Sequence, residues 1–245
     1  MAQIDIIDDE VSLDDPVLVE GFPGVGLVGK MAVDHLIDVF EMDHYANVHC
    51  ASIPPVATYR RDTHELATPV RLYVDAERDL LALQSDVPIG PEGATEFGNC
   101  VADWFTETEL LPVYLSGLPR QTDGPPALFG VSSGGGETVL AAADIDEPIG
   151  MGLISGPTGA LLAHAVKHDS RAVGLIVESN PQLPDPVASQ VLIEQGIAPI
   201  ANITVSTDDL STRADEIEEA RAQLIQRMQQ ATDDSSRAQP LQMYQ

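Results

Sequence analysis

The sequence carries its first candidate chemistry in a glycine-rich stretch near the N-terminus, residues 21–31. The glycine spacing matches the G-x-G-x-x-G fingerprint of dinucleotide-binding proteins, and Lys30 completes a P-loop in which methionine replaces the final hydroxyl residue. Such turns hold phosphates on backbone N–H groups, and Glu41 or Asp43 follows at a spacing suited to a ribose hydroxyl. Glycines also let a helix pack closely on a strand, because they lack a Cβ atom. The turn therefore either binds a nucleotide or serves packing alone; its glycines are Gly21, Gly24, Gly26 and Gly29.

A second candidate is Ser132, which lies in a G-x-S-x-G pattern typical of the nucleophile elbow of α/β-hydrolases. Asp144 or Asp146, followed by His164 or His168, would complete a catalytic triad in the order of that fold. An elbow needs a helix directly after the serine, and each glycine costs a helix about 1 kcal/mol. Three glycines follow here, so the pattern disfavours a serine hydrolase; they are Gly134, Gly135 and Gly136.

A third candidate is the pair His164 and His168, which stand four residues apart on a predicted helix. Side chains at this spacing share one helix face, so both imidazoles could reach one metal ion. The intervening residues lack the glutamate of the H-E-x-x-H pattern, and no third ligand is suitably spaced. We therefore expect a surface pair, and we predict neither a metal site nor a cofactor.

Strand-like and helix-like runs alternate along the chain, which predicts an α/β sandwich. Residues 185–197 illustrate the signals, because Asp185 is a typical helix cap and Pro186 a typical first helical residue. We expect one domain over residues 1–230, ending in a helix from Ser211 to Gln230, and a flexible tail over residues 231–245. The predicted strands are residues 14–22, 111–118, 126–133 and 171–179 with a hairpin at 70–89, and the other helices cover residues 27–40, 91–110 and 156–169.

The composition combines strong acidity with a normal share of hydrophobic residues. The chain contains 12 Lys and Arg and 39 Asp and Glu, which gives a formal net charge of −27, while 44% of its residues are hydrophobic. Such a chain folds, and its acidic, lysine-poor surface is typical of a protein adapted to molar salt, where self-repulsion is screened. The charge argues against nucleic-acid binding, because no basic stripe is available to neutralise phosphates.

The sequence also predicts a cytoplasmic protein. No run of about 18 apolar residues is long enough to cross a membrane, and the first ten residues lack the features of a signal peptide. Cys50 and Cys100 are isolated in the sequence, so we expect buried thiols in a reducing compartment.

Five stretches occur in the order typical of the archaeal branch of the proteasome assembly chaperone two family, which the sequence resembles over most of residues 15–200. Ile53 departs from the pattern, since many members have an aromatic residue there. The resemblance implies a three-layer α/β/α sandwich like that of the purine nucleoside phosphorylases. It also implies self-association, binding to the proteasome α-ring, no established catalysis and a packing role for the glycine turn. The stretches are GFPGVGLVGKMAVDHL, SIPP, GVSSGGGE, GPTGALL and PDPVASQVLIEQ.

The last three residues, Met243, Tyr244 and Gln245, resemble the hydrophobic-Tyr-any ending with which proteasome activators enter pockets between α-subunits. Tyrosine accounts for 5 of 245 residues and 44% are hydrophobic, so a chance match has a probability of about 0.01. Residues 231–242, if flexible, have a root-mean-square span of about 17 to 21 Å, enough to reach a neighbouring surface. An oligomer would present several tails and gain avidity.

These observations favour a non-enzymatic proteasome assembly chaperone or adaptor that forms a homo-oligomer and binds α-subunits through its tail. Two enzymatic alternatives remain. One is a nucleotide-binding or phosphorylase-like enzyme that uses Gly24–Lys30, although the sequence shows no paired magnesium carboxylates that would support the ATP-grasp label given to some family members. The weaker alternative is a hydrolase with Ser132 as its nucleophile.

Overall fold

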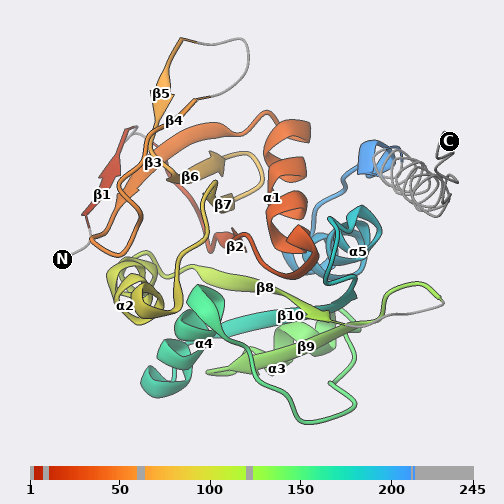
Figure 1. Cartoon of the computed structure of the whole chain (residues 1–245). Coiled ribbons are helices and arrows are strands. Elements are labelled where there is room, and N and C mark those ends of the chain that lie inside the picture. Colours follow the sequence, from red (N-terminus) through yellow and green to blue (C-terminus); the bar gives the residue numbers. More distant parts are fainter. Residues whose placement is uncertain (1–2, 8–10, 60–63, 120–123, 211, 213–245) are drawn as a thin grey trace, which may run out of the picture.

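The computed structural model describes residues 3–7, 11–59, 64–119, 124–210 and 212. Its centre is an eight-stranded sheet with the strand order β1-β3-β6-β7-β2-β8-β10-β9 (Figure 1). A separate two-stranded sheet pairs β4 (Thr58–Tyr59) with β5 (Leu66–Ala67). The strands of the large sheet are β1 (Gln3–Ile6), β2 (Val17–Gly21), β3 (Asp43–His49), β6 (Val70–Asp75), β7 (Leu80–Ser85), β8 (Leu111–Pro119), β9 (Leu128–Ser133) and β10 (Ala172–Ser179).

The middle of the large sheet is parallel and its two sides are antiparallel. Strands β7, β2, β8 and β10 run in one direction. Beyond β7, strands β6, β3 and β1 alternate in direction, and on the other side of the sheet the edge strand β9 pairs antiparallel with β10. The four parallel strands therefore have their carboxyl ends at the same end of the sheet, which is where α/β proteins commonly place their sites.

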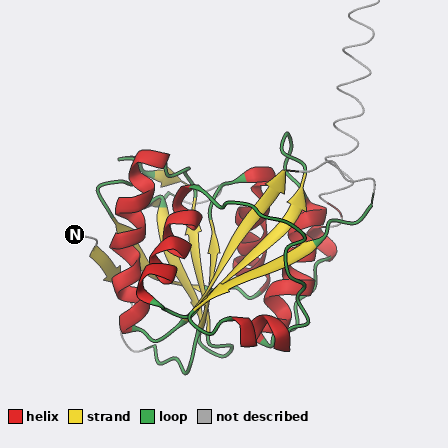
Figure 2. Ribbon diagram, turned by 90° about the horizontal axis from the view of Figure 1, so that it is seen from below, coloured by secondary structure: helices red, strands yellow, loops and turns green. Residues whose placement is uncertain are grey.

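Helices cover both faces of this sheet, which gives three layers (Figure 2). On one face α1 (Val28–Val39) packs with α5 (Pro186–Val191), and α3 (Glu137–Ala142) packs nearby. On the other face α2 (Pro91–Glu107) packs against α4 (Gly156–His168). The α/β class expected from the sequence is thus confirmed, whereas the finer likeness to purine nucleoside phosphorylases stays a prediction.

Residues of β2 alternate between two separate apolar cores. Val19 contributes to the core under α1, while Leu18 contributes to the core under α2 and α4. Successive side chains of a strand point to opposite faces, so a central strand with a helical layer on each side is apolar throughout. The exception within β2 is Glu20, whose side chain is fully buried.

The helix predicted over residues 185–197 begins as expected and then changes its winding. The Asp185 side chain accepts a hydrogen bond from the backbone N–H of Ala188 at 3.0 Å, and Pro186 is the first helical residue. From Leu192–Ile197 the winding is that of a π-helix, and the chain continues into α6 (Ala198–Ala201). The sequence signals thus located the cap but gave no sign of the wider turn.

One expectation about the cysteines is wrong. Cys50, which follows β3, and Cys100, within α2, form a disulfide with their Cα atoms 6.6 Å apart. The two residues are 50 positions apart in sequence, so their proximity depends on how α2 packs beside the loop after β3. The bridge therefore links the α2 layer to the antiparallel side of the sheet.

The C-terminal predictions lie outside the described residues. Apart from Thr212, this applies to the expected helix from Ser211 to Gln230 and to the whole of residues 231–245. The division into a domain over 1–230 and a tail stays a prediction. In the part of the chain that the structure describes, no helix is both long enough and apolar enough to span a membrane.

Candidate functional site

The glycine turn connects β2 to α1 and lies against the end of β10. Gly26 has a φ of 61°, in the left-handed region that favours glycine. A Cβ atom at this position would overlap the hydroxyl group of Ser179, and the backbone N–H of Asp185 donates to the Gly26 carbonyl at 2.8 Å. The chain itself therefore packs closely against Gly26, and glycine is required at this position for packing.

The neighbouring glycines differ in the room around them. A Cβ atom on Gly21 would overlap Val33 of α1, and one on Gly29 would lie 3.1 Å from the Cβ atom of Leu115 in β8. At Gly24 the nearest heavy atom, a backbone oxygen, would be 4.0 Å away. Gly21, Gly26 and Gly29 thus permit close packing, while the fold makes no comparable demand at Gly24.

Lys30, the lysine of the P-loop-like pattern, is held by two carboxylates. Its Nζ atom lies 2.6 Å from Asp34 Oδ2 and 3.3 Å from Asp86 Oδ1, and its side chain is 16% exposed. Asp86 also pairs with the buried Arg71, 2.5 Å from its Nη2 atom, and Gln84 bridges Asp34 and Asp86. The ammonium group is therefore neutralised within the protein and does not point at an open phosphate cradle.

The two cations of this network, Arg71 and Lys30, lower the pKa of Asp86. Burial by itself would raise the pKa of the Asp86 carboxyl, but hydrogen bonds and charges from Arg71 and Lys30 hold its pKa below the ordinary value. Arg71 is 1% exposed, and its guanidinium also donates to Gln84 at 2.7 Å and to the hydroxyl of Tyr73 at 2.9 Å. The network is internally satisfied, which is the arrangement that makes buried charges tolerable.

Glu20 is a buried acid in the middle of the sheet, and the sequence analysis did not identify it. Its oxygens accept hydrogen bonds from the hydroxyl of Thr158 at 3.0 Å and from the backbone N–H of Leu115 at 3.2 Å. Burial raises the pKa of Glu20 to about 8, so the carboxyl group is protonated at neutral pH. Burial, with a further contribution from Glu20, also raises the pKa of Tyr114. The sequence did contain a signal for the buried Glu20, since it is the one charged residue in the otherwise apolar run of residues 17–21.

The structural context of Ser132 is not that of a nucleophile elbow. Ser132 lies on β9, an antiparallel edge strand, whereas a nucleophile elbow follows a strand within the sheet and leads directly into a helix. Gly134 and Gly135 take left-handed conformations, and α3 begins after Gly136. Ser132 lines one cavity and His164 lines another.

The histidine pair forms a stack. The rings of His164 and His168 have centroids 4.2 Å apart and an interplanar angle of 25°. Over the described ranges of the chain, no group of three or more His, Cys, Asp and Glu side chains is placed to hold a metal ion.

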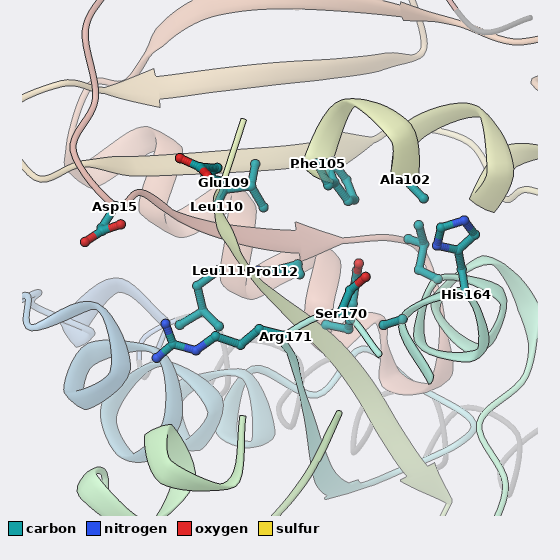
Figure 3. A pocket seen from close by; sticks show the side chains of 13 residues that line it. Asp15, Ala102, Phe105, Glu109, Leu110, Leu111, Pro112, His164, Ser170 and Arg171 are labelled. Carbon is teal, nitrogen blue, oxygen red and sulfur yellow. The ribbon is translucent and has the colours of Figure 1, made fainter. Parts of the chain in front are cut away.

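A cavity of about 310 Å³ lies between α2 and α4 at the amino ends of β2, β8 and β10. Its walls combine polar and charged side chains with apolar ones, of which Phe105 and Leu161 are buried. Asp15, Glu109 and Arg171 lie toward one end and His164 toward the other (Figure 3). The cavity lies at the amino ends of the parallel strands, whereas α/β folds usually bind ligands at the carboxyl ends.

A second cavity, of about 530 Å³, lies at the carboxyl ends of β8 and β10. Its lining is largely apolar and includes Glu178, which is 3% exposed. Residues 148–154 form one wall, and three of them are almost fully exposed: Ile149, Met151 and Leu153. Glu178 and these apolar residues escaped the sequence analysis, although a glutamate in a buried strand and apolar residues alternating with glycines were visible signals.

The tail residues Met243, Tyr244 and Gln245 lie outside the described residues, so their candidate role stays a prediction.

Comparisons with known proteins identify relatives over nearly the whole chain. The model of the PAC2 family matches residues 18–225. An uncharacterised protein of Methanocaldococcus jannaschii is 26% identical over 220 residues, which cover 89% of this chain and 88% of that protein.

Two solved structures from Pyrococcus furiosus share the fold. PbaA, described as an archaeal homologue of proteasome-assembly chaperone, superposes with a TM-score of 0.80 at 22% identity, covering 96% of this chain and 95% of PbaA. PbaB, described as an archaeal proteasome activator, superposes with a TM-score of 0.77 at 20% identity, covering 91% of this chain and 98% of PbaB.

Proposed function

Because the chain belongs to the PAC2 family, we propose that it is a proteasome assembly chaperone or adaptor that binds proteasome α-subunits through its C-terminal tail. The observation that carries the proposal is the family match over residues 18–225. The descriptions of PbaA and PbaB support a role connected with the proteasome. In this proposal the protein is non-enzymatic and acts in the cytoplasm.

The tail supplies the proposed binding contact. Met243 would fill an apolar pocket, while Tyr244 would add a large rigid surface with one hydroxyl group to satisfy. The terminal carboxylate of Gln245 would pair with a lysine of the α-subunit. In a homo-oligomer several tails would act together, so weak single contacts would sum to useful avidity.

The packing of the glycine turn favours this proposal over a nucleotide-binding enzyme. Gly26 faces Ser179 and Asp185, and the Lys30 ammonium lies between Asp34 and Asp86. Each of these arrangements supports the fold without a bound phosphate.

A binding assay with purified α-subunits tests the proposal. Deletion of Met243, Tyr244 and Gln245, or the single change Tyr244→Ala, is expected to weaken binding about tenfold or more, as loss of a buried aromatic anchor does. Leu241→Ala is the matched control, because it removes an apolar side chain just outside the three-residue ending. Circular dichroism and light scattering should give the same fold and particle mass for all variants. Equal binding by the truncated chain would refute the tail mechanism.

A further inference from the structure

The 310 Å³ cavity between α2 and α4 combines buried apolar walls with a charged end. Phe105 and Leu161 are buried in the walls, whereas Asp15, Glu109 and Arg171 are exposed and lie toward one end (Figure 3). Each charged residue comes from a different connection, since Asp15 precedes β2, Glu109 precedes β8 and Arg171 precedes β10. The volume is at the lower end of the range for pockets that bind small molecules.

Tyr114 of β8 adds a hydroxyl group to the lining of this cavity. Its side chain is 3% exposed, and no hydrogen bond joins the hydroxyl to another described residue. Every fully buried polar side-chain atom in the described ranges has a hydrogen-bond partner, so the Tyr114 hydroxyl is still accessible, and the cavity gives access to it. Burial raises the pKa of Tyr114, so the group stays protonated and is a hydrogen-bond donor. A buried donor without a partner is uncommon and is satisfied by a ligand that accepts its proton.

Arg171 is one of the few cations that the fold does not pair with a carboxylate. Of the five Lys and Arg among the described residues, three form ion pairs within the protein, whereas Lys167 and Arg171 do not. Asp15 and Glu109 line the same cavity as Arg171, yet neither forms an ion pair with it. A guanidinium group that has no structural carboxylate can bind the carboxylate of a ligand.

The charges at this end of the cavity select the head group of a ligand. A simple carboxylate would pair with Arg171 but would be repelled by Asp15 and Glu109. A simple amine would pair with the two carboxylates but would leave the guanidinium without a partner. A zwitterion that carries an ammonium and a carboxylate group on neighbouring atoms satisfies all three side chains.

The position of Tyr114 limits the rest of the ligand. Tyr114 pairs with Gly174, which is three residues along β10 from Arg171, so it lies about 10 Å farther along the strands than the charged end. The walls between these two points include Phe105 and Leu161. The ligand body is therefore apolar, about as long as one aromatic side chain, and ends in a hydrogen-bond acceptor.

We propose that the cavity between α2 and α4 binds a free amino acid whose aromatic side chain ends in a hydrogen-bond acceptor. Its carboxylate pairs with Arg171, its ammonium group lies between Asp15 and Glu109, and its ring packs against the apolar walls. Its terminal acceptor receives a hydrogen bond from the Tyr114 hydroxyl. This site is separate from the tail and does not depend on the function proposed above.

Three small molecules test the selection of the head group. The probes are L-tyrosine, tyramine, which lacks the carboxylate, and 3-(4-hydroxyphenyl)propanoate, which lacks the amine. Isothermal titration calorimetry on the full chain, at one fixed KCl concentration, gives the three values of Kd. L-Tyrosine is expected to bind about tenfold or more tightly than either analogue. Absence of L-tyrosine binding, or equal binding of all three molecules, would overturn the proposal.

Two charge variants assign each half of the zwitterion. Arg171→Gln should remove the advantage of L-tyrosine over tyramine, and Asp15→Asn should reduce its advantage over the propanoate. The matched controls are Lys167→Gln and Asp14→Asn, which remove the same charges from exposed residues outside the cavity lining and should retain both preferences. An unchanged preference over tyramine in Arg171→Gln would overturn the proposal.

Tyr114→Phe tests the hydrogen bond to the end of the ligand. The unaltered chain is expected to bind L-tyrosine about tenfold more tightly than L-phenylalanine, and Tyr114→Phe should bind the two equally. Tyr59→Phe is the matched control, because Tyr59 is 83% exposed and does not line the cavity. Circular dichroism should show the same fold for all variants. A preference for L-tyrosine that persists in Tyr114→Phe would overturn the proposed binding mode.

Discussion

The hydroxyl group of Thr158, in the first turn of α4, donates to the Glu20 carboxyl in the middle of the sheet at 3.0 Å. This contact joins a helix to the central strand β2 through a residue that holds a proton at neutral pH, because burial raises the pKa of Glu20 to about 8. Because the folded chain holds this proton more tightly than the unfolded chain, Glu20 contributes most to stability at low pH. Most acidic groups, whose pKa is lowered by folding, contribute most at high pH.

The stability of the protein is expected to fall as the pH rises from about 5 to about 8. In this window the unfolded chain has lost the Glu20 proton, since the ordinary pKa is 4.5, while the folded chain retains it. The contribution of Glu20 therefore declines by about 1.4 kcal/mol per pH unit and levels off above the folded pKa. Glu20→Gln should remove this component, and Glu77→Gln, at an exposed position, should not. Denaturant unfolding from pH 5 to 9 measures it; equal slopes for Glu20→Gln and the unaltered chain would contradict the expectation.

Gly26→Ala is expected to destabilise the protein by about 2 kcal/mol or more, because the new Cβ atom would meet Ser179 at a backbone conformation that favours glycine. Gly24→Ala, in the same turn, should cost less than about 1 kcal/mol, because the nearest heavy atom would be 4.0 Å away. Urea unfolding of the two variants gives the comparison. Similar losses of stability at both positions would contradict the expectation that close packing requires glycine at position 26 but not at position 24.

Neither ATP nor NAD at millimolar concentration is expected to raise the melting temperature. The Lys30 ammonium is held by Asp34 and Asp86, and the chain itself packs closely against Gly26. A ligand at 100 times its Kd would add about 2.7 kcal/mol of stability, which a thermal shift assay detects readily. A nucleotide-dependent rise that disappears in Lys30→Met would favour the enzymatic alternative.

Reduction of the disulfide between Cys50 and Cys100 is expected to lower the free energy of unfolding by about 2 to 4 kcal/mol. The bridge closes a loop with a sequence separation of 50, and it restricts the unfolded chain more than the folded one. Unfolding with and without dithiothreitol measures the loss, and the double variant Cys50→Ser with Cys100→Ser should not respond to the reductant. Two reactive thiols in the denatured, unreduced protein would contradict the bridge.

Lowering the salt concentration from molar to about 0.1 M is expected to loosen or unfold the protein. The screening length grows from about 3 Å to about 10 Å, so carboxylates of a chain with a net charge of −27 repel one another over longer distances. Melting temperatures measured in KCl across this range test the expectation. A constant melting temperature would rule out salt adaptation.

The order of secondary structure was predictable because its signals are local. The apolar run before the glycines predicted β2, the helical spacing after them predicted α1, and two β-rich runs around a polar turn predicted the hairpin of β6 and β7. The cap at Asp185 followed in the same way. Each signal depends on neighbours within a few residues, so the sequence by itself determined these elements and the α/β class. It also contains the tail ending that motivates the proposed function.

The tertiary structure decided which of these elements are neighbours, and the candidate sites depend on that. Lys30 meets Asp86 because β2 and β7 are adjacent, and Glu20 is buried because β2 lies inside the sheet beneath α4. Cys50 reaches Cys100 because α2 packs beside the loop after β3. Hydrophobic periodicity reports which face of an element is buried but carries no information on strand order or on the partner that covers the face. Contacts between distant segments were therefore accessible only from the fold.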